Sequence, residues 1–199
     1  MLKVLDLAKI SELFSFDSDE ELYLLVAMAR RKHNPQMSRY KDQIVLRKVV
    51  HSLDEWETKM EHLLAETRCH PYLFQLYVRF NPASSRKAYR LLKEKFAEWD
   101  FRNDIAKIKR VDSQWVSLLQ KPEATARRQY YLIDVDDLGV LPAVEETLKS
   151  LDVRAEFPTP SGKHYLVRPF NVTLLKVEGV EVKKDALFAI GFAGGGKDG

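Results

Sequence analysis

The chain has 199 residues, of which 45% are hydrophobic and 31% are charged, with 32 basic and 29 acidic side chains. This balance excludes a disordered tail, and no apolar run reaches the roughly 20 residues that a membrane-spanning helix needs. Cys69 is the single cysteine and cannot form an internal disulfide, which favours a reducing compartment. We therefore expect a soluble cytoplasmic protein with no membrane partner, whose oligomeric state the sequence does not indicate.

Charge is distributed unevenly along the chain. Residues 30–48 hold seven basic residues and one acidic residue, and residues 79–110 hold ten basic and four acidic. Residues 134–156 reverse the sign, with two basic and seven acidic. Two basic segments and one acidic segment suit a polyanion bound beside a metal site, although each basic segment alone is also typical of a solvated helix face.

The first seventy residues carry helix signals. A capping box, in which serine and glutamate side chains satisfy free N–H groups at a helix start, occurs at Ser18–Glu21 and at Ser52–Glu55. Apolar residues at helical spacing follow each box. We therefore predict one helix from residue 18 to about residue 33 and another from residue 52 toward Pro71, which makes residues 1–70 a helical region.

From residue 72 the pattern changes to strands alternating with helices. The expected elements are a strand at 72–80, a helix at 84–99, a short helix around Trp115, a strand at 129–135, a helix after Pro142, strands at 153–157 and 164–170, and one or two strands within 180–192. This order predicts an α+β fold, in which a mixed sheet over residues 71–192 carries its helices on one face. Residues 191–197 fit the G-x₄-G-K spacing of a phosphate-binding loop, but Asp198 stands where Ser or Thr should bind Mg²⁺. We interpret residues 193–199 as a flexible glycine-rich tail.

Two aspartates mark the end of an apolar strand. In the segment Ile133-Asp134-Val135-Asp136, alternate side chains share a face, so Asp134 and Asp136 project to the same side, roughly 6–7 Å apart. Carboxylates that close repel unless a cation lies between them, and Mg²⁺ or Mn²⁺ prefers such oxygen ligands. The pair therefore indicates a metal platform for phosphoryl chemistry. The alternative is that the aspartates cap the following turn.

A second candidate motif, Thr159-Pro-Ser-Gly-Lys-His164, lies between two short strands. Gly162 permits a close backbone approach, Ser161 supplies a hydroxyl, and Lys163 and His164 can donate hydrogen bonds to an anion. The motif therefore suits phosphate oxygens, and the alternative is an ordinary hairpin turn.

Together, the segments LIDVDD (132–137) and PSGKHYLV (160–167) resemble the first two motifs of the archaeo-eukaryotic primase superfamily, which includes the primase-polymerases and the polymerase domains of bacterial end-joining ligases. With looser strand order the resemblance extends over residues 72–192, and the chain also looks like small phage-encoded proteins. It implies an RRM-like catalytic sheet, with Asp134 and Asp136 on divalent metal ions and Ser161 and His164 on the phosphates of a nucleotide. It also implies a third acidic residue on a later strand, for which Asp185 is the first candidate and Glu181 the second.

Three functions follow as hypotheses. In the first, the protein is a metal-dependent nucleotidyltransferase of primase-polymerase type: Asp134, Asp136 and Asp185 hold Mg²⁺ or Mn²⁺, while Ser161, Lys163 and His164, assisted by Arg168, hold a nucleoside triphosphate. Basic helices at 30–48 and 84–95 would then follow the backbone of a DNA or RNA template. In the second, a non-catalytic module binds single-stranded nucleic acid by stacking bases on Phe74 or Tyr77. In the third, the protein has a structural or interaction role, and its aspartates only cap a turn.

Overall fold

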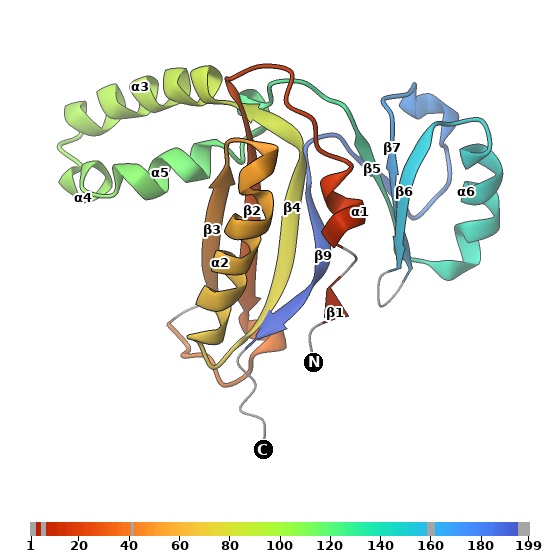
Figure 1. Cartoon of the computed structure of the whole chain (residues 1–199), viewed down its shortest axis with the longest axis horizontal. Coiled ribbons are helices and arrows are strands. Elements are labelled where there is room, and N and C mark those ends of the chain that lie inside the picture. The colour runs from red at the N-terminus through yellow and green to blue at the C-terminus, as the bar shows by residue number, and fades with distance from the viewer. Residues whose placement is uncertain (1–2, 5–6, 41, 159–161, 195–199) are drawn as a thin grey trace. The chain divides into compact units, whose positions relative to one another are not determined.

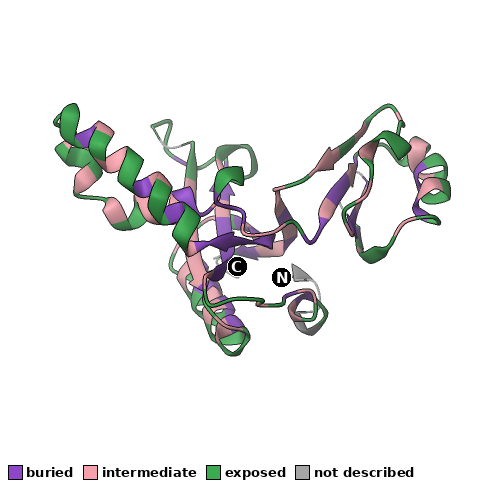
Figure 2. Ribbon diagram, turned by 90° about the horizontal axis from the view of Figure 1, so that it is seen from above, coloured by how far each residue is buried: buried purple, intermediate pink, exposed green. Residues whose placement is uncertain are grey.

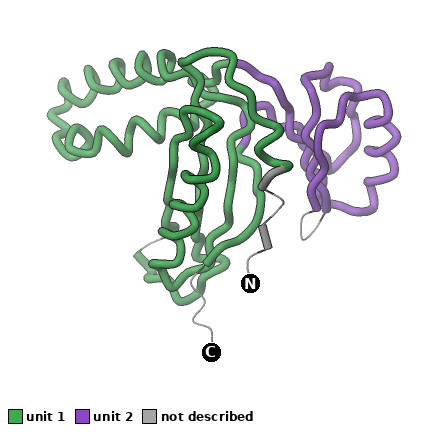
Figure 3. Tube along the Cα trace, viewed as in Figure 1, with its two compact units in different colours: residues 1–126, 187–199 green, residues 127–186 purple. Residues whose placement is uncertain are grey.

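The computed structural model describes residues 3–4, 7–40, 42–158 and 162–194 (Figure 1). The chain forms two compact units, which are residues 1–126 together with 187–199 (unit 1) and residues 127–186 (unit 2) (Figure 3). Both units combine strands with helices, which confirms the predicted α+β class. The boundaries between the units fall at residues 126–127 and 186–187 rather than at residue 70, so the predicted core at 71–192 belongs partly to each unit.

Unit 1 is built on a five-stranded antiparallel sheet, in the order β1-β9-β4-β2-β3. Its strands are β1 (Lys3–Val4), β2 (Glu21–Arg30), β3 (Gln43–Val50), β4 (Leu73–Ser84) and β9 (Leu187–Gly194). Strand β9 follows unit 2 in the sequence and returns to unit 1, where it pairs with β4. The first two residues of the predicted tail at 193–199 belong to this strand, and residues 195–199 lie outside the described residues.

One face of this sheet is covered by helix α2 (Trp56–Arg68), which follows the 3₁₀ turn η2 (Leu53–Glu55). The α2 side chains of Trp56, Met60 and Leu63 are buried, and the ring centroids of Phe14 and Trp56 are 4.4 Å apart. A short helix, α1 (Leu7–Ser11), lies between β1 and β2 in the chain. The predicted helix from Ser52 toward Pro71 is thus confirmed, because its apolar stripe faces the sheet.

A helical extension follows β4. It contains α3 (Ser85–Phe101), α4 (Ile105–Ile108), α5 (Val111–Leu118) and the 3₁₀ turn η3 (Pro122–Ala124). The hydroxyl of Ser84 accepts a hydrogen bond from the Lys87 N–H at 3.1 Å, which caps α3 as expected for a serine at this position. Leu92, Trp99 and Leu118 bury the contact between α3 and α5, while the outer side of α3 is exposed (Figure 2).

Arg79, on β4, ties this extension to the sheet. Its side chain is fully buried, and its guanidinium donates hydrogen bonds to the Leu119 carbonyl, the Lys121 carbonyl and the Thr125 hydroxyl. The first two carbonyls belong to the end of α5 and the turn after it, where a helix leaves acceptors unsatisfied. Arg79 therefore caps α5 from the interior of the sheet.

Unit 2 contains a four-stranded antiparallel sheet in the order β6-β7-β5-β8. Its elements are β5 (Tyr131–Val135), η4 (Leu138–Val140), α6 (Leu141–Leu148), β6 (Val153–Pro158), β7 (Lys163–Val167), η5 (Val172–Leu174) and β8 (Val180–Lys183). The first strand therefore lies between the third and the fourth, and the second lies at an edge. This is the strand order of an RRM-like fold, with η5 in place of the second helix.

Helix α6 covers one face of this second sheet. Ile133 and Val135 of β5 pack with Val144 and Leu148 of α6 in a buried cluster that also includes Tyr165 and Val167. Because side chains alternate along a strand, Asp134 lies on the opposite face of the sheet. The apolar strand thus fixes where its aspartate points.

The helix predicted over residues 18–33 is wrong. Strand β2 occupies Glu21–Arg30, and the basic segment at 30–48 forms the 3₁₀ turn η1 (Arg31–His33) and strand β3 instead of a helix. Residues 21–27 are all buried, so β2 has apolar side chains on both faces and shows no alternation. None of the described helices combines the length and apolar character that crossing a membrane would require.

Candidate functional site

The two sequence motifs meet on the face of unit 2 opposite α6. Asp134 on β5 pairs directly with His164 on β7 on one side and with Glu181 on β8 on the other. Directly paired residues share a face, so these three side chains form one row across the sheet. Asp136 follows one residue beyond the end of β5 and is exposed. The structure therefore brings together the aspartate and histidine motifs, which lie thirty positions apart in the sequence.

Asp134 is held from two sides. Its Oδ1 lies 2.7 Å from Nε2 of His164, and its Oδ2 accepts a hydrogen bond from Nζ of Lys183 at 2.6 Å. The side chain of Asp134 is only 12% exposed and that of His164 only 14%. Little water competes for these contacts, so both are stronger than an exposed ion pair would be.

Lys183 supplies the positive charge of this row. Its Nζ also lies 2.9 Å from Oε2 of Glu181, so two carboxylates converge on one ammonium group. Burial of Lys183 disfavours its charged form, but the hydrogen bonds to Asp134 and Glu181 outweigh that effect and raise the pKa of the ammonium. Lys183 was not predicted as a site residue, because only the register of β8 against β5 reveals that it reaches Asp134.

Gly162 of the second motif makes the closest backbone approach in the site. A Cβ atom at this position would lie 1.8 Å from the carbonyl oxygen of Val135 and 3.2 Å from Cα of Asp136. Only glycine fits there, so the close approach predicted for this motif is present at the end of β5 that carries Asp136. Ser161, the predicted phosphate ligand beside it, lies outside the described residues.

Lys163 does not join His164 in the site. Adjacent residues of a strand point to opposite faces, and Nζ of Lys163 lies 3.1 Å from Oε1 of Glu145 on α6. The hydrogen bond to Glu145 raises the pKa of Lys163. The Tyr165 hydroxyl donates to the same Glu145 oxygen at 3.1 Å, so Lys163 belongs to the packing of α6 on the sheet.

Asp185 and Arg168 lie toward the other end of β5. Asp185 follows Lys183 by two residues, and Lys183 pairs with Leu132, so the chain has moved away from Asp136 by that point. The Asp185 side chain is 7% exposed and forms an ion pair with Arg128 at 2.8 Å. The guanidinium of Arg168 lies 5.0 Å from the ring centre of Tyr130 and donates to the Gln129 carbonyl. The acidic position beside Asp134 is filled by Glu181, which was the second choice.

No complete metal site is formed in the described part of the chain. Among these residues, no group of three or more His, Cys, Asp or Glu side chains is arranged to hold a metal ion. Asp134 and Glu181 nevertheless converge on a cation, which is the ammonium of Lys183. The carboxylates are therefore spaced for a cation, and a divalent ion bound between them would have to displace Lys183.

Some of the residues predicted to bind a template or to stack on bases are buried or already paired with other protein groups. The predicted helix at 84–95 is present in α3, but Lys87 donates to the Thr125 carbonyl and Arg86 pairs with Glu20 at 2.7 Å. Phe74 is fully buried, so it cannot stack on a base. Tyr77 is half-buried on β4 and has an odd position in a strand where Phe74 has an even one, so the two rings face opposite sides of the sheet.

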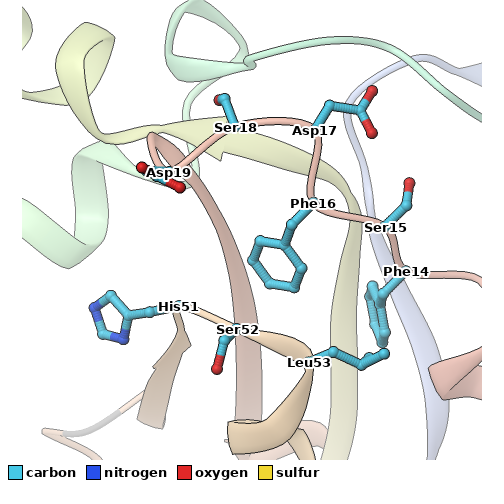
Figure 4. A pocket seen from close by; sticks show the side chains of 9 residues that line it. All are labelled: Phe14, Ser15, Phe16, Asp17, Ser18, Asp19, His51, Ser52 and Leu53. Atoms are coloured by element: carbon cyan, nitrogen blue, oxygen red, sulfur yellow. The ribbon is translucent and has the colours of Figure 1, made fainter.

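Unit 1 also contains a pocket of about 470 Å³ that the sequence did not indicate. It lies between residues 14–19 and residues 51–53, and the ring of Phe16 points from the first segment toward the second (Figure 4). Nδ1 of His51 at its edge lies 3.1 Å from Oε2 of Glu55. The lining mixes two aromatic rings with the carboxylates of Asp17 and Asp19, and it includes no residue of the aspartate and histidine motifs of unit 2.

The comparisons with known proteins identify no relative: no family model, no curated protein and no solved structure matches this chain.

Proposed function

We propose that this protein is a metal-dependent nucleotidyltransferase of primase-polymerase type, which acts on nucleoside triphosphates and a DNA or RNA template. The observation that carries the proposal is the direct pairing of Asp134 with His164 on the two central strands of a sheet with RRM-like order. The resemblance of the two motifs implies this arrangement, whereas two residues thirty positions apart in a sequence need not lie side by side in the fold. Gly162, tucked against the end of β5, gives further support.

Asp134, Asp136 and Glu181 are the residues that would hold Mg²⁺ or Mn²⁺. The donor set fits a hard divalent ion, because it consists of carboxylate oxygens and two of its members already converge on the ammonium of Lys183. When bound, such an ion would activate an attacking hydroxyl and neutralise charge that develops on the leaving pyrophosphate. His164, released from Asp134, would donate a hydrogen bond to a phosphate oxygen of the nucleotide.

A primer-extension assay tests the proposal. The full chain is incubated with a primed oligonucleotide template, the four nucleoside triphosphates and Mn²⁺ or Mg²⁺, and products are resolved by length. Extension by the wild type is expected to fall at least 100-fold in Asp134→Asn and in Glu181→Gln. Asp152→Asn is the matched control, because Asp152 is an exposed carboxylate of unit 2 that pairs with Arg154 away from the row. Unchanged extension in Asp134→Asn would contradict the proposal.

A second candidate function, a nucleic-acid-binding module without catalysis, is favoured by Lys183. Its ammonium already neutralises Asp134 and Glu181, so the sheet is electrostatically complete without a metal ion. Thermal unfolding in Mn²⁺ and in EDTA separates the two functions. A rise of the melting temperature with Mn²⁺ that is lost in Asp134→Asn supports the enzyme, and an unchanged melting temperature supports the binding module.

A further inference from the structure

The sheet of unit 1 has a second face, opposite α2. On β3, Lys48 faces α2 and pairs with Glu66 of that helix, so its neighbour Arg47 projects to the other side. The strand pairings place Arg47 in one row across the sheet, and the next row lies directly beside it. The first row is Arg47, Val26, Tyr77 and Ala189, and the second is Val45, Met28, Gln75 and Phe192. We call these two rows, with Arg30 beyond them on β2, the arginine face.

The arginine face carries positive charge and no carboxylate. Arg30 and Arg47 are its charged members, and the other positions are apolar, aromatic or amide side chains. The row on the other side of Arg47 contains Arg79. That side chain is fully buried beneath the helical extension, where it caps α5. By contrast, Arg47, Tyr77 and Phe192 are only half-buried.

Within the described part of the chain, the two guanidinium groups of this face have no anionic partner. Among the described residues, Nε of Arg47 is buried without a hydrogen-bond acceptor, and no carboxylate pairs with Arg47 or Arg30. Burial lowers the pKa of Arg47, because its charge is partly desolvated and not compensated. Arg30 contacts two soft groups: its Nε lies 3.0 Å from Sδ of Met28, and its guanidinium carbon lies 5.9 Å from the ring centre of Tyr77.

Aromatic rings lie between and beside these charges. The Tyr77 hydroxyl donates to Oε1 of Gln75 at 2.6 Å, and Gln75 is the next residue on the same face of β4. This bond holds the ring along the strand rather than upright from it. Phe192 lies in the row beside Tyr77 and is also half-buried. The face therefore offers two rings and two guanidinium groups among largely apolar side chains.

From this arrangement we infer that the arginine face binds a single strand of nucleic acid, with Arg47 and Arg30 on phosphates and Tyr77 on a base. Planar guanidinium groups match phosphate oxygens, and aromatic rings accept any base by stacking. A duplex hides its bases from such a face, so the single strand is the better occupant. The inference concerns unit 1 and is independent of the metal chemistry proposed for unit 2, so either can fail without the other.

Fluorescence anisotropy with the full chain in EDTA tests the inference, using labelled (dT)₂₀ and a labelled duplex of equal length. We expect (dT)₂₀ to bind more tightly than the duplex, and Arg47→Gln to weaken its binding about tenfold, as for loss of one charge-assisted hydrogen bond. Arg102→Gln is the control, because it removes the same charge from an exposed arginine at the end of α3. Tyr77→Leu should also weaken binding about tenfold and Tyr77→Phe much less, because phenylalanine keeps the stacking ring.

Two further measurements make the outcome decisive. The slope of log Kd against log salt should fall by about 0.7 in Arg47→Gln, since one phosphate contact is lost. If Arg47→Gln does not fold, Arg30→Gln is measured in its place. Equal affinities of Arg47→Gln and Arg102→Gln, or tighter binding of the duplex, would overturn the inference. Displacement of (dT)₂₀ by an equal charge of polyglutamate would also overturn it and would assign the face to acidic peptides.

Discussion

Replacing Asp134 by alanine should destabilise unit 2 even in the absence of any metal ion. The carboxylate accepts a hydrogen bond from Lys183 at 2.6 Å and lies 2.7 Å from the ring of His164, and only 12% of the side chain is exposed. Hydrogen bonds to charged groups contribute about 1.5–3 kcal/mol each. One such bond, from Lys183, is lost together with the close contact to His164, while Lys183 keeps its second partner, Glu181, so we take the total as about 3 kcal/mol. For a chain of this length that corresponds to a melting temperature lower by about 6–12 °C.

The matched comparison is Asp136→Ala. Asp136 is exposed just beyond the end of β5, so its replacement should change the free energy of unfolding by about 0.5 kcal/mol or less. The sequence alone suggests the opposite behaviour, because two carboxylates on one strand face repel, so that replacing both by alanine should leave the fold as stable as before or slightly more stable. The structure predicts a loss at Asp134, since its charge is compensated.

Urea unfolding followed by circular dichroism gives the free energies, and hydrogen exchange with mass spectrometry assigns the change to a unit. Faster exchange is expected in β5 and β7 of Asp134→Ala, with β4 of unit 1 unchanged. Equal stabilities of the two alanine variants, or a more stable Asp134→Ala, would refute the reasoning. That result would mean that the contacts to His164 and Lys183 contribute no net stability.

Three other outcomes are expected. Arg79→Met should cost about 3–5 kcal/mol in urea unfolding, because it leaves buried acceptors at the end of α5 unpaired, and Arg79→Lys should cost less. Gly162→Ala should cost about 1–3 kcal/mol, measured in the same way, because its Cβ would overlap the Val135 carbonyl; an unchanged stability would contradict that overlap. The stability lost in Lys183→Met should be constant up to about pH 10 and shrink above it. The reason is that a lysine whose pKa is raised in the folded state stabilises the fold at pH values below its ordinary pKa near 10.4, and this stabilisation is lost as pH rises through the folded-state pKa. A stability difference between the wild type and Lys183→Met that does not change up to about pH 12 would exclude this linkage.

The sequence predicted the elements of unit 2 well because each has a local signal. Strand β5 is a short apolar run, α6 has a proline in its first turn, and Gly162 marks the turn before β7. Strand β2 was missed for a physical reason. A strand buried on both faces has no two-residue period, and its apolar residues can match helical spacing by chance. Its supposed capping glutamate, Glu21, instead accepts a hydrogen bond from the Asp17 N–H at 2.9 Å.

The candidate site was predicted only as far as single segments allow. Asp134 and His164 were identified because each sits in a local motif, and their pairing then follows from the strand order. Lys183 and Glu181 could not be ranked above Asp185, because strand register decides which of them reaches Asp134 and register is not written in any one segment. The arginine face depends on four strands at once, and one of them, β9, is separated from the others by the whole of unit 2.

The return of β9 to the sheet of unit 1 has a consequence for synthesis. A ribosome makes residues 127–186 after most of unit 1 but before β9, so unit 2 has all of its strands while unit 1 still lacks one. Until residues 187–194 emerge, one side of β4 presents unpaired backbone groups, which are a template for wrong pairing. The nascent chain therefore completes its second unit first, and folding of unit 2 also shortens the distance that β9 must search to reach β4.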